Sequence, residues 1–256
     1  MLIEAIFAAA LATSGPQSVV VDGLGPPPKG WTVIDQPRNE DEWRCSNYSQ
    51  DEWAVDGKSV HDAVISPYEH AKEVTLELAG GRLIGTNHGE FGGRVEWEAR
   101  GSLRRVLVAS ANPVALTRRG NDVFVATGLA HLTLNSGEVL RLRRSDDDSW
   151  QLSKVIDLGE APNAAFRKDE TTWIVLTTNG VTRVDLSALT KQQIYRNGNW
   201  WLLYGNSIAP LGNSWLIGAR RAVIRLTPSA EGYREEWLAP DSCKRITGPG
   251  CDCQAN

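Results

Sequence analysis

From about residue 73 onward, the chain repeats one pattern four times, and this repeat limits the possible folds more than any other feature. In each copy an apolar run passes through a turn rich in Gly, Asn or Asp into a second apolar run that ends in a small residue or at a turn. The second runs occupy residues 83–87, 123–128, 173–180 and 215–219. Matched positions in these runs, Gly85, Ala126, Leu176 and Gly218, are 41, 50 and 42 residues apart.

Two further strand-like runs complete each copy, which gives four strands in a period of about 40–45 residues, as one blade of a β-propeller requires. The copies span about 73–111, 112–161, 162–205 and 206–240, and residues 31–72, with Trp43 and Trp53, are long enough for one more divergent blade. Ten Trp, 24 Gly and one Met also suit strands and turns better than a helical bundle. We therefore predict an all-β protein, a β-propeller of five blades with four antiparallel strands each.

The propeller fold predicts which strands are buried and which distant segments are neighbours. The first and second strands of each blade should be buried on both faces, and the outer strand should be wetter. Ring closure should bring residues 40–70 next to residues 225–240, and the short run 19–21 is a candidate for an extra outer strand on the last blade.

The repeat resembles those of secreted β-propeller repeat proteins, a superfamily rather than a single family. It shares with them an apolar strand, a Gly/Asn/Asp turn and an aromatic-aliphatic second strand, over some 170 residues. The chain lacks the Gly-His and Trp-Asp pairs of WD repeats, and its double glycine, Gly80-Gly81, occurs once rather than once per blade as in kelch repeats. The resemblance implies a fold and no particular activity, because propellers carry many functions.

The N-terminus predicts export. Residues 5–12 are apolar and end in a small-x-small pattern, so residues 1–14 are expected to be a signal peptide, although no Lys or Arg precedes the apolar run. The alternative is an N-terminal helix packed on the domain. Residues 15–30 form a Pro- and Gly-rich entry segment, residues 31–240 the propeller and residues 241–256 a tail.

Four cysteines, Cys45, Cys243, Cys251 and Cys253, suit disulfide bonds in an exported chain. Since a propeller brings its first and last blades together, we expect one bond from Cys45 to the tail and a second bond within the tail. Cys251 and Cys253 are too close in sequence to bridge each other without strain. Zinc is not expected, because the spacing is C-x-C and the tail has no histidine.

The loops between the second and third strands of the blades should emerge on one face of a propeller. This rule predicts a binding face, whose candidate residues are Asn87, His88, Glu90, His131, Asn179, Arg220 and Arg221. His88 and Glu90, on a Gly-flanked turn, are the candidates for general acid and base catalysis if the protein is an enzyme. The alternative is an ordinary solvated loop. Trp200 and Trp201 could grip a protein or glycan surface, or pack between blades.

Several classes of function are excluded or unsupported. The chain has no Gly-x-Ser-x-Gly elbow, P-loop, His-Glu-x-x-His motif or dinucleotide fingerprint, so we predict no cofactor and no metal. A net charge of −4 argues against nucleic acid as a partner, and after residue 15 no apolar run is long enough to span a membrane.

Two functions remain. The first is a periplasmic or extracellular, monomeric binding module that presents one loop face to a protein or glycan. The alternative is a propeller enzyme of the glycoside hydrolase or lyase type.

Overall fold

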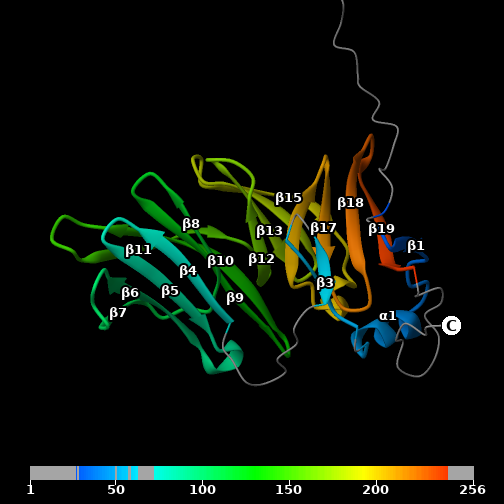
Figure 1. The fold of residues 1–256 in the computed structure, drawn as a ribbon, viewed down its shortest axis with the longest axis horizontal. Helices are drawn as coiled ribbons and strands as arrows, with labels where there is room; N and C mark the ends of the chain where they lie inside the picture. The colour runs from blue at the N-terminus through cyan, green and yellow to red at the C-terminus, as the bar shows by residue number, and fades with distance from the viewer. Residues whose placement is uncertain (1–26, 28, 50, 57–58, 63–71, 242–256) are drawn as a thin grey trace, which may run out of the picture.

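A computed structural model of the chain describes residues 27, 29–49, 51–56, 59–62 and 72–241, and most of them belong to five antiparallel sheets (Figure 1). The first sheet contains β4 (Lys72–Leu78), β5 (Gly81–Asn87), β6 (Gly93–Ala99) and β7 (Arg105–Ala109). The second contains β8 (Pro113–Arg119), β9 (Asp122–His131), β10 (Leu134–Arg144) and β11 (Trp150–Asp157). The third contains β12 (Pro162–Arg167), β13 (Thr172–Thr177), β14 (Gly180–Asp185) and β15 (Thr190–Arg196).

The fourth sheet has five strands, β16 (Ser207–Leu211), β17 (Ser214–Gly218), β18 (Val223–Ser229), β19 (Gly232–Pro240) and, beyond β19, β1 (Trp31–Ile34). The fifth has two, β2 (Trp53–Val55) and β3 (Val60–Asp62). The helices are α1 (Glu40–Asn47) and two 3₁₀ turns, η1 (Gly89–Phe91) and η2 (Trp200–Leu203).

The innermost strands β4, β8, β12 and β16 contact one another in that order, and β2 then contacts β16 and β17. Successive four-stranded sheets that meet through their first strands are the blades of a β-propeller. The predicted all-β propeller fold is therefore confirmed. Four blades have at least four strands, and the blade predicted in residues 31–72 has two strands within the described part of the chain.

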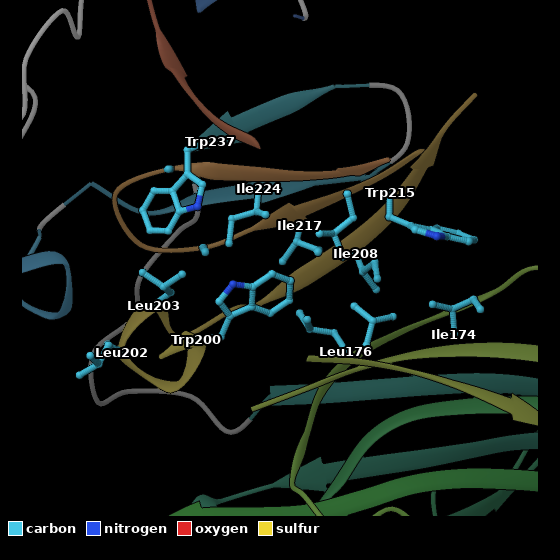
Figure 2. Packing of buried hydrophobic residues seen from close by; sticks show 14 of the residues in the cluster. Ile174, Leu176, Trp200, Leu202, Leu203, Ile208, Trp215, Ile217, Ile224 and Trp237 are labelled. Carbon is cyan, nitrogen blue, oxygen red and sulfur yellow. The ribbon is translucent and has the colours of Figure 1, made fainter. Parts of the chain in front are cut away.

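Apolar side chains from the second and third strands fill the spaces between neighbouring sheets. Leu83 and Trp97 of the first sheet pack with Val125 and Leu142 of the second. Between the third and fourth sheets, Trp200 lies among Leu176, Ile217 and other buried residues (Figure 2). Burial of such side chains is the main stabilising term of the fold.

The burial gradient confirms part of the prediction. The second strands β13 and β17 are buried along most of their length and β9 over its first half, and the outer strands β7 and β15 are mostly exposed. The first strands β8 and β12 are only half-buried, which corrects the expectation for them. As edge strands they have a paired neighbour on one side only, so sheet pairing does not cover their inner edge.

Residues 31–72 differ from the predicted blade in two ways. Residues 31–34 leave this blade and pair with β19, from Trp31↔Pro240 to Ile34↔Trp237, and so extend the fourth sheet. Trp43 lies in a helix rather than a strand, and its ring meets that of Trp237 edge to face at 5.4 Å. We predicted that residues 40–70 lie next to residues 225–240, and α1 does lie there. The run 19–21 lies outside the described residues.

The face of the first sheet that points away from the second sheet is largely polar, although it also carries the buried Ile84. Leu83 and Trp97 point toward the second sheet, so their strand neighbours Arg82 and Glu98 point the other way, where Arg82 pairs with Glu98 at 2.8 Å. Arg105 also contacts Glu98 there, at 3.2 Å. Within the described residues, no apolar cluster joins this sheet to β2 and β3. Closure of the ring at this point stays a prediction.

Candidate functional site

The loops between second and third strands lie at one end of the sheets, as predicted from the propeller topology. We call this end the loop edge, and it consists of residues 87–93, 128–137, 178–179 and 219–222 together with α1, η2 and their C-caps, Tyr48 and Tyr204. Figure 1 shows α1 and the tip of the β9–β10 hairpin along the lower side of the molecule. Every predicted binding residue belongs to this edge, but the residues fall into three separate groups.

The first group joins the first two sheets. Glu90 Oε2 lies 2.9 Å from His131 Nδ1, and both side chains are about half-exposed. Asn87 Oδ1 accepts a hydrogen bond from the Gly89 amide at 2.8 Å, and Asn112 Nδ2 donates to the Gly89 carbonyl at 2.9 Å. These bonds fix the η1 turn. The side chain that Glu90 contacts is therefore His131 on the neighbouring blade.

His131 belongs to a ribbon that projects beyond its sheet. β9 and β10 pair from Gly128↔Gly137 to His131↔Leu134, whereas β8 pairs with β9 only as far as Thr127. At the tip, Leu132 is 92% exposed and has φ of +53°, a left-handed conformation that leucine rarely adopts. Leu132 thus combines an exposed apolar side chain with a strained backbone conformation. Such departures from local preference concentrate at functional sites.

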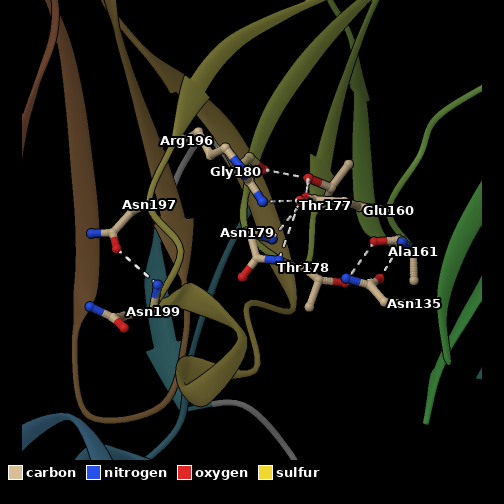
Figure 3. Close-up of polar contacts among 10 residues, drawn as sticks. All are labelled: Asn135, Glu160, Ala161, Thr177, Thr178, Asn179, Gly180, Arg196, Asn197 and Asn199. Carbon is tan, nitrogen blue, oxygen red and sulfur yellow. Dashed lines mark hydrogen bonds and ion pairs between the residues drawn. The ribbon is translucent and has the colours of Figure 1, made fainter. Parts of the chain in front are cut away.

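The second group surrounds Glu160, a residue that the sequence analysis did not single out. Its carboxylate accepts hydrogen bonds from Thr177 Oγ1 at 2.9 Å, from the backbone amide and side chain of Asn179 and from Arg196 at 3.1 Å (Figure 3). Asn135 of the ribbon accepts from the Ala161 amide at 2.8 Å. Asn179 therefore holds the connection between β11 and β12 through Glu160, and its side-chain amide donates to that carboxylate.

The third group links α1 to the fourth sheet through two arginines. Arg221 is 6% exposed, and it donates to Ser46 Oγ at 2.6 Å and to the Glu42 carbonyl at 3.2 Å. Burial lowers the pKa of Arg221 to about 10, because it disfavours the charged guanidinium, and the charge of Glu42 opposes this effect. Arg221 is one of the predicted binding residues, and its side chain is buried, where it holds α1 in place.

Arg220 is more accessible and supports an aromatic side chain. Its guanidinium carbon lies 3.9 Å from the ring centroid of Tyr204, and its Nη1 donates to the Asn47 carbonyl at 2.8 Å. Trp200 and Trp201 have different environments, because Trp200 is buried between the sheets whereas Trp201 is 51% exposed. Trp200 therefore packs between the blades, and the binding role of the exposed Trp201 stays a prediction.

The exposed aromatic side chains are concentrated at the loop edge. Among the described residues, four aromatic side chains are exposed, Tyr48, Phe91, Trp201 and Tyr204, and all four lie there. Leu132 and Leu134 of the ribbon are also exposed and adjoin η1 through the Glu90–His131 pair. The opposite edge has isolated exposed leucines, such as Leu103, and no exposed aromatic residue in the described chain.

Two predictions concern metal binding and the disulfide bonds. The described residues hold no group of three or more His, Cys, Asp or Glu side chains that could bind a metal ion. Cys45 lies in α1 and is not free. Cys243, Cys251 and Cys253 lie outside the described residues, so the predicted pairing of Cys45 with the tail stays a prediction. No described helix is long and apolar enough to cross a membrane.

Comparison with known proteins finds no matching family model and no matching curated protein. Solved structures that resemble this chain include a nidogen/laminin complex, with TM-score 0.43, 8% identity and coverage of 70% of this chain and 68% of that one. A putative phosphatase from Bacteroides thetaiotaomicron gives TM-score 0.45 and 10% identity, covering 81% and 52%. An engineered GH43 glycoside hydrolase gives 0.38 and 12%, covering 72% and 44%. The fold assignment rests on the strand order and sheet packing described above.

Proposed function

We propose that the chain is an exported binding module that presents its loop edge to a protein partner. The observation that carries the proposal is the position of Tyr48, Phe91, Trp201 and Tyr204, the four exposed aromatic side chains of the described chain, at one end of the sheets. Exposed aromatic residues are typical of protein interfaces, where they provide much of the binding energy. Export is supported by the apolar segment 5–12 and by the cysteine content.

The preorganisation of the edge adds support. The ribbon is held on one side by His131 with Glu90 and on the other by Asn135 with the Ala161 amide. An interface that is already ordered before binding loses less conformational entropy when the partner binds. A glycan is the alternative partner. The hydrolase or lyase alternative, with His88 and Glu90, would need a second carboxyl group about 5–10 Å from Glu90, and the contact that the structure gives Glu90 is with an imidazole.

The proposal predicts that Leu132→Asn loses partner binding and keeps its stability. Asparagine tolerates a left-handed backbone, so the melting temperature should stay the same or rise slightly. The variant also removes an exposed apolar side chain from the loop edge. Proteins that immobilised wild-type chain captures from an extract of its source should therefore be lost with Leu132→Asn.

Leu103→Asn is the matched control, because Leu103 is 99% exposed on the opposite edge. It should capture the same proteins as wild type. The proposal fails if Leu132→Asn together with Phe91→Ala captures the same proteins in the same amounts as wild type, or if the Leu103 variant loses them.

A further inference from the structure

The two faces of η2 have opposite character. Trp200 and Leu203, three residues apart, are buried against the fourth sheet, whereas Trp201 and Tyr204, also three residues apart, are exposed. Trp201 lies within η2, and Tyr204 follows it as the C-cap with a left-handed backbone. They are the two exposed aromatic side chains of this segment. We call this pair the η2 platform.

The Tyr204 ring of the η2 platform is held in place by its neighbours. Arg220 stacks on Tyr204 at 3.9 Å and is anchored by the Asn47 carbonyl, and its Nε lies 3.6 Å from Glu52 Oε2. Tyr204 itself has φ of +49°, a conformation that a non-glycine residue keeps only where its surroundings enforce it. A ring fixed in this way is ready to pack against a partner with little loss of entropy.

The surroundings of the η2 platform are acidic. Residues 35–56, which include α1, contain seven Asp and Glu against two Arg. Arg220 and Arg221, the two cations that the β17–β18 loop adds, leave seven acids against four bases. This excess is local, since the whole chain has a net charge of only −4.

A second acidic feature lies behind η2. The Glu235 carboxylate accepts hydrogen bonds from Trp237 Nε1 at 2.6 Å, from Trp200 Nε1 at 3.3 Å, from Asn197 Nδ2 at 3.1 Å and from the Tyr195 hydroxyl. All four donors are neutral, and within the described residues Glu235 has no cationic partner. Burial and Glu235 together raise the pKa of Tyr195, because both disfavour the phenolate. A carboxylate whose charge is not neutralised adds to the negative potential at η2.

We propose that the η2 platform docks a basic peptide segment of a protein partner, with an Arg or Lys side chain over Trp201 and further cations facing α1. Cations bind favourably over the face of a tryptophan ring, and complementary charge strengthens such a contact. Anionic membranes do not fit, since the same acidic residues repel them. The inference rests on the proposed function and adds the chemistry of the partner.

Isothermal titration calorimetry with a defined probe tests the inference. The probe is an acetylated, amidated octapeptide of alternating glycine and arginine, and its glutamate counterpart serves as the negative control. We expect the arginine peptide to bind, with an affinity that decreases as salt increases. Trp201→Ala should weaken binding about tenfold, as loss of a cation–π contact of about 1–2 kcal/mol implies. The glutamate peptide should not bind.

Two controls separate this site from general attraction to an acidic protein. Trp201→Phe should retain most of the affinity, because it keeps an aromatic face. Asp146→Asn with Asp148→Asn changes an acidic turn at the opposite edge that has no exposed aromatic side chain, and should leave the affinity unchanged. Thermal melting of each variant confirms that it is folded.

The inference is overturned if the arginine peptide does not bind, if Trp201→Ala binds it as wild type does, or if the Asp146 and Asp148 variant loses it. Sedimentation of the protein with phosphatidylcholine vesicles that depends on Trp201 would instead assign the η2 platform to a membrane, and would also overturn it. If Leu132→Asn loses captured proteins while the arginine peptide fails to bind, only this inference falls, and the proposed function stands.

Discussion

Trp237→Ala is expected to lower the free energy of unfolding by about 3–5 kcal/mol, the usual cost of removing a large aromatic side chain from a core. Trp237 is fully buried, its ring meets Trp43 of α1 at 5.4 Å, and its Nε1 donates to Glu235 at 2.6 Å. The substitution therefore leaves a cavity and removes one donor of Glu235. For a chain of this size, the melting temperature should fall by roughly 6–20 °C.

Trp237→Phe is the control for the size of the side chain. It keeps most of the ring and loses the indole N–H, so its melting temperature should lie between those of wild type and Trp237→Ala. A Trp237→Ala protein that melts within 2 °C of wild type would show that the joint between α1 and the fourth sheet is not part of the stabilising core.

Gly218→Ala is expected to release the β2–β3 sheet from the fourth sheet. A Cβ at Gly218 would lie 2.8 Å from the Ala54 Cα and would overlap the Trp53 carbonyl oxygen, both of which are backbone atoms of β2. Overpacking of this kind costs about 1–3 kcal/mol. The Trp53 amide donates to the Ala219 carbonyl at 3.0 Å, and the Val55 amide donates to Ser207 Oγ at 2.9 Å. Hydrogen exchange at both amides should accelerate.

Gly198→Ala is the matched control, because no atom lies within 4 Å of a Cβ built there. Its exchange rates at Trp53 and Val55 should equal those of wild type. Unchanged protection of these two amides in Gly218→Ala would contradict the position of the fifth sheet.

Most strands could be predicted because their signals are local. The apolar runs at 123–128 and 173–180 became β9 and β13, and the third and fourth runs of each copy became the third and fourth strands of the sheets. The same periodicity placed the loops that form one edge. The repeat did not predict that residues 31–34 pair with β19. That pairing joins segments about 200 residues apart and depends on tertiary contacts.

α1 had a sequence signal that was not used. Asn39 Oδ1 accepts from the Glu42 amide at 3.0 Å, and Glu42 Oε2 accepts from the Arg38 amide at 2.8 Å. Asn followed three residues later by Glu is a recognisable start of a helix. Trp43 lies in the stretch for which the repeat predicts a blade. In the structure it is the residue through which α1 packs on Trp237.

The polar contacts of the candidate site were harder to predict. Glu160 and Glu235 each gather donors that are mostly 17–40 residues away, so no short motif marks either residue. Arg221 was grouped with Arg220 because the two are adjacent in a loop. Their opposite roles depend on α1, which covers Arg221 and leaves the Arg220–Tyr204 stack nearer the surface.

The most direct test of the central claim, that the loop edge contacts a partner, is photo-crosslinking in the source cell. A benzophenone-bearing amino acid replaces Phe91 or Trp201 in separate variants, and Leu103 on the opposite edge in a third. The account predicts adducts of one defined mass from positions 91 and 201 and none from position 103. Equal adducts from all three positions, or adducts from position 103 alone, would contradict it.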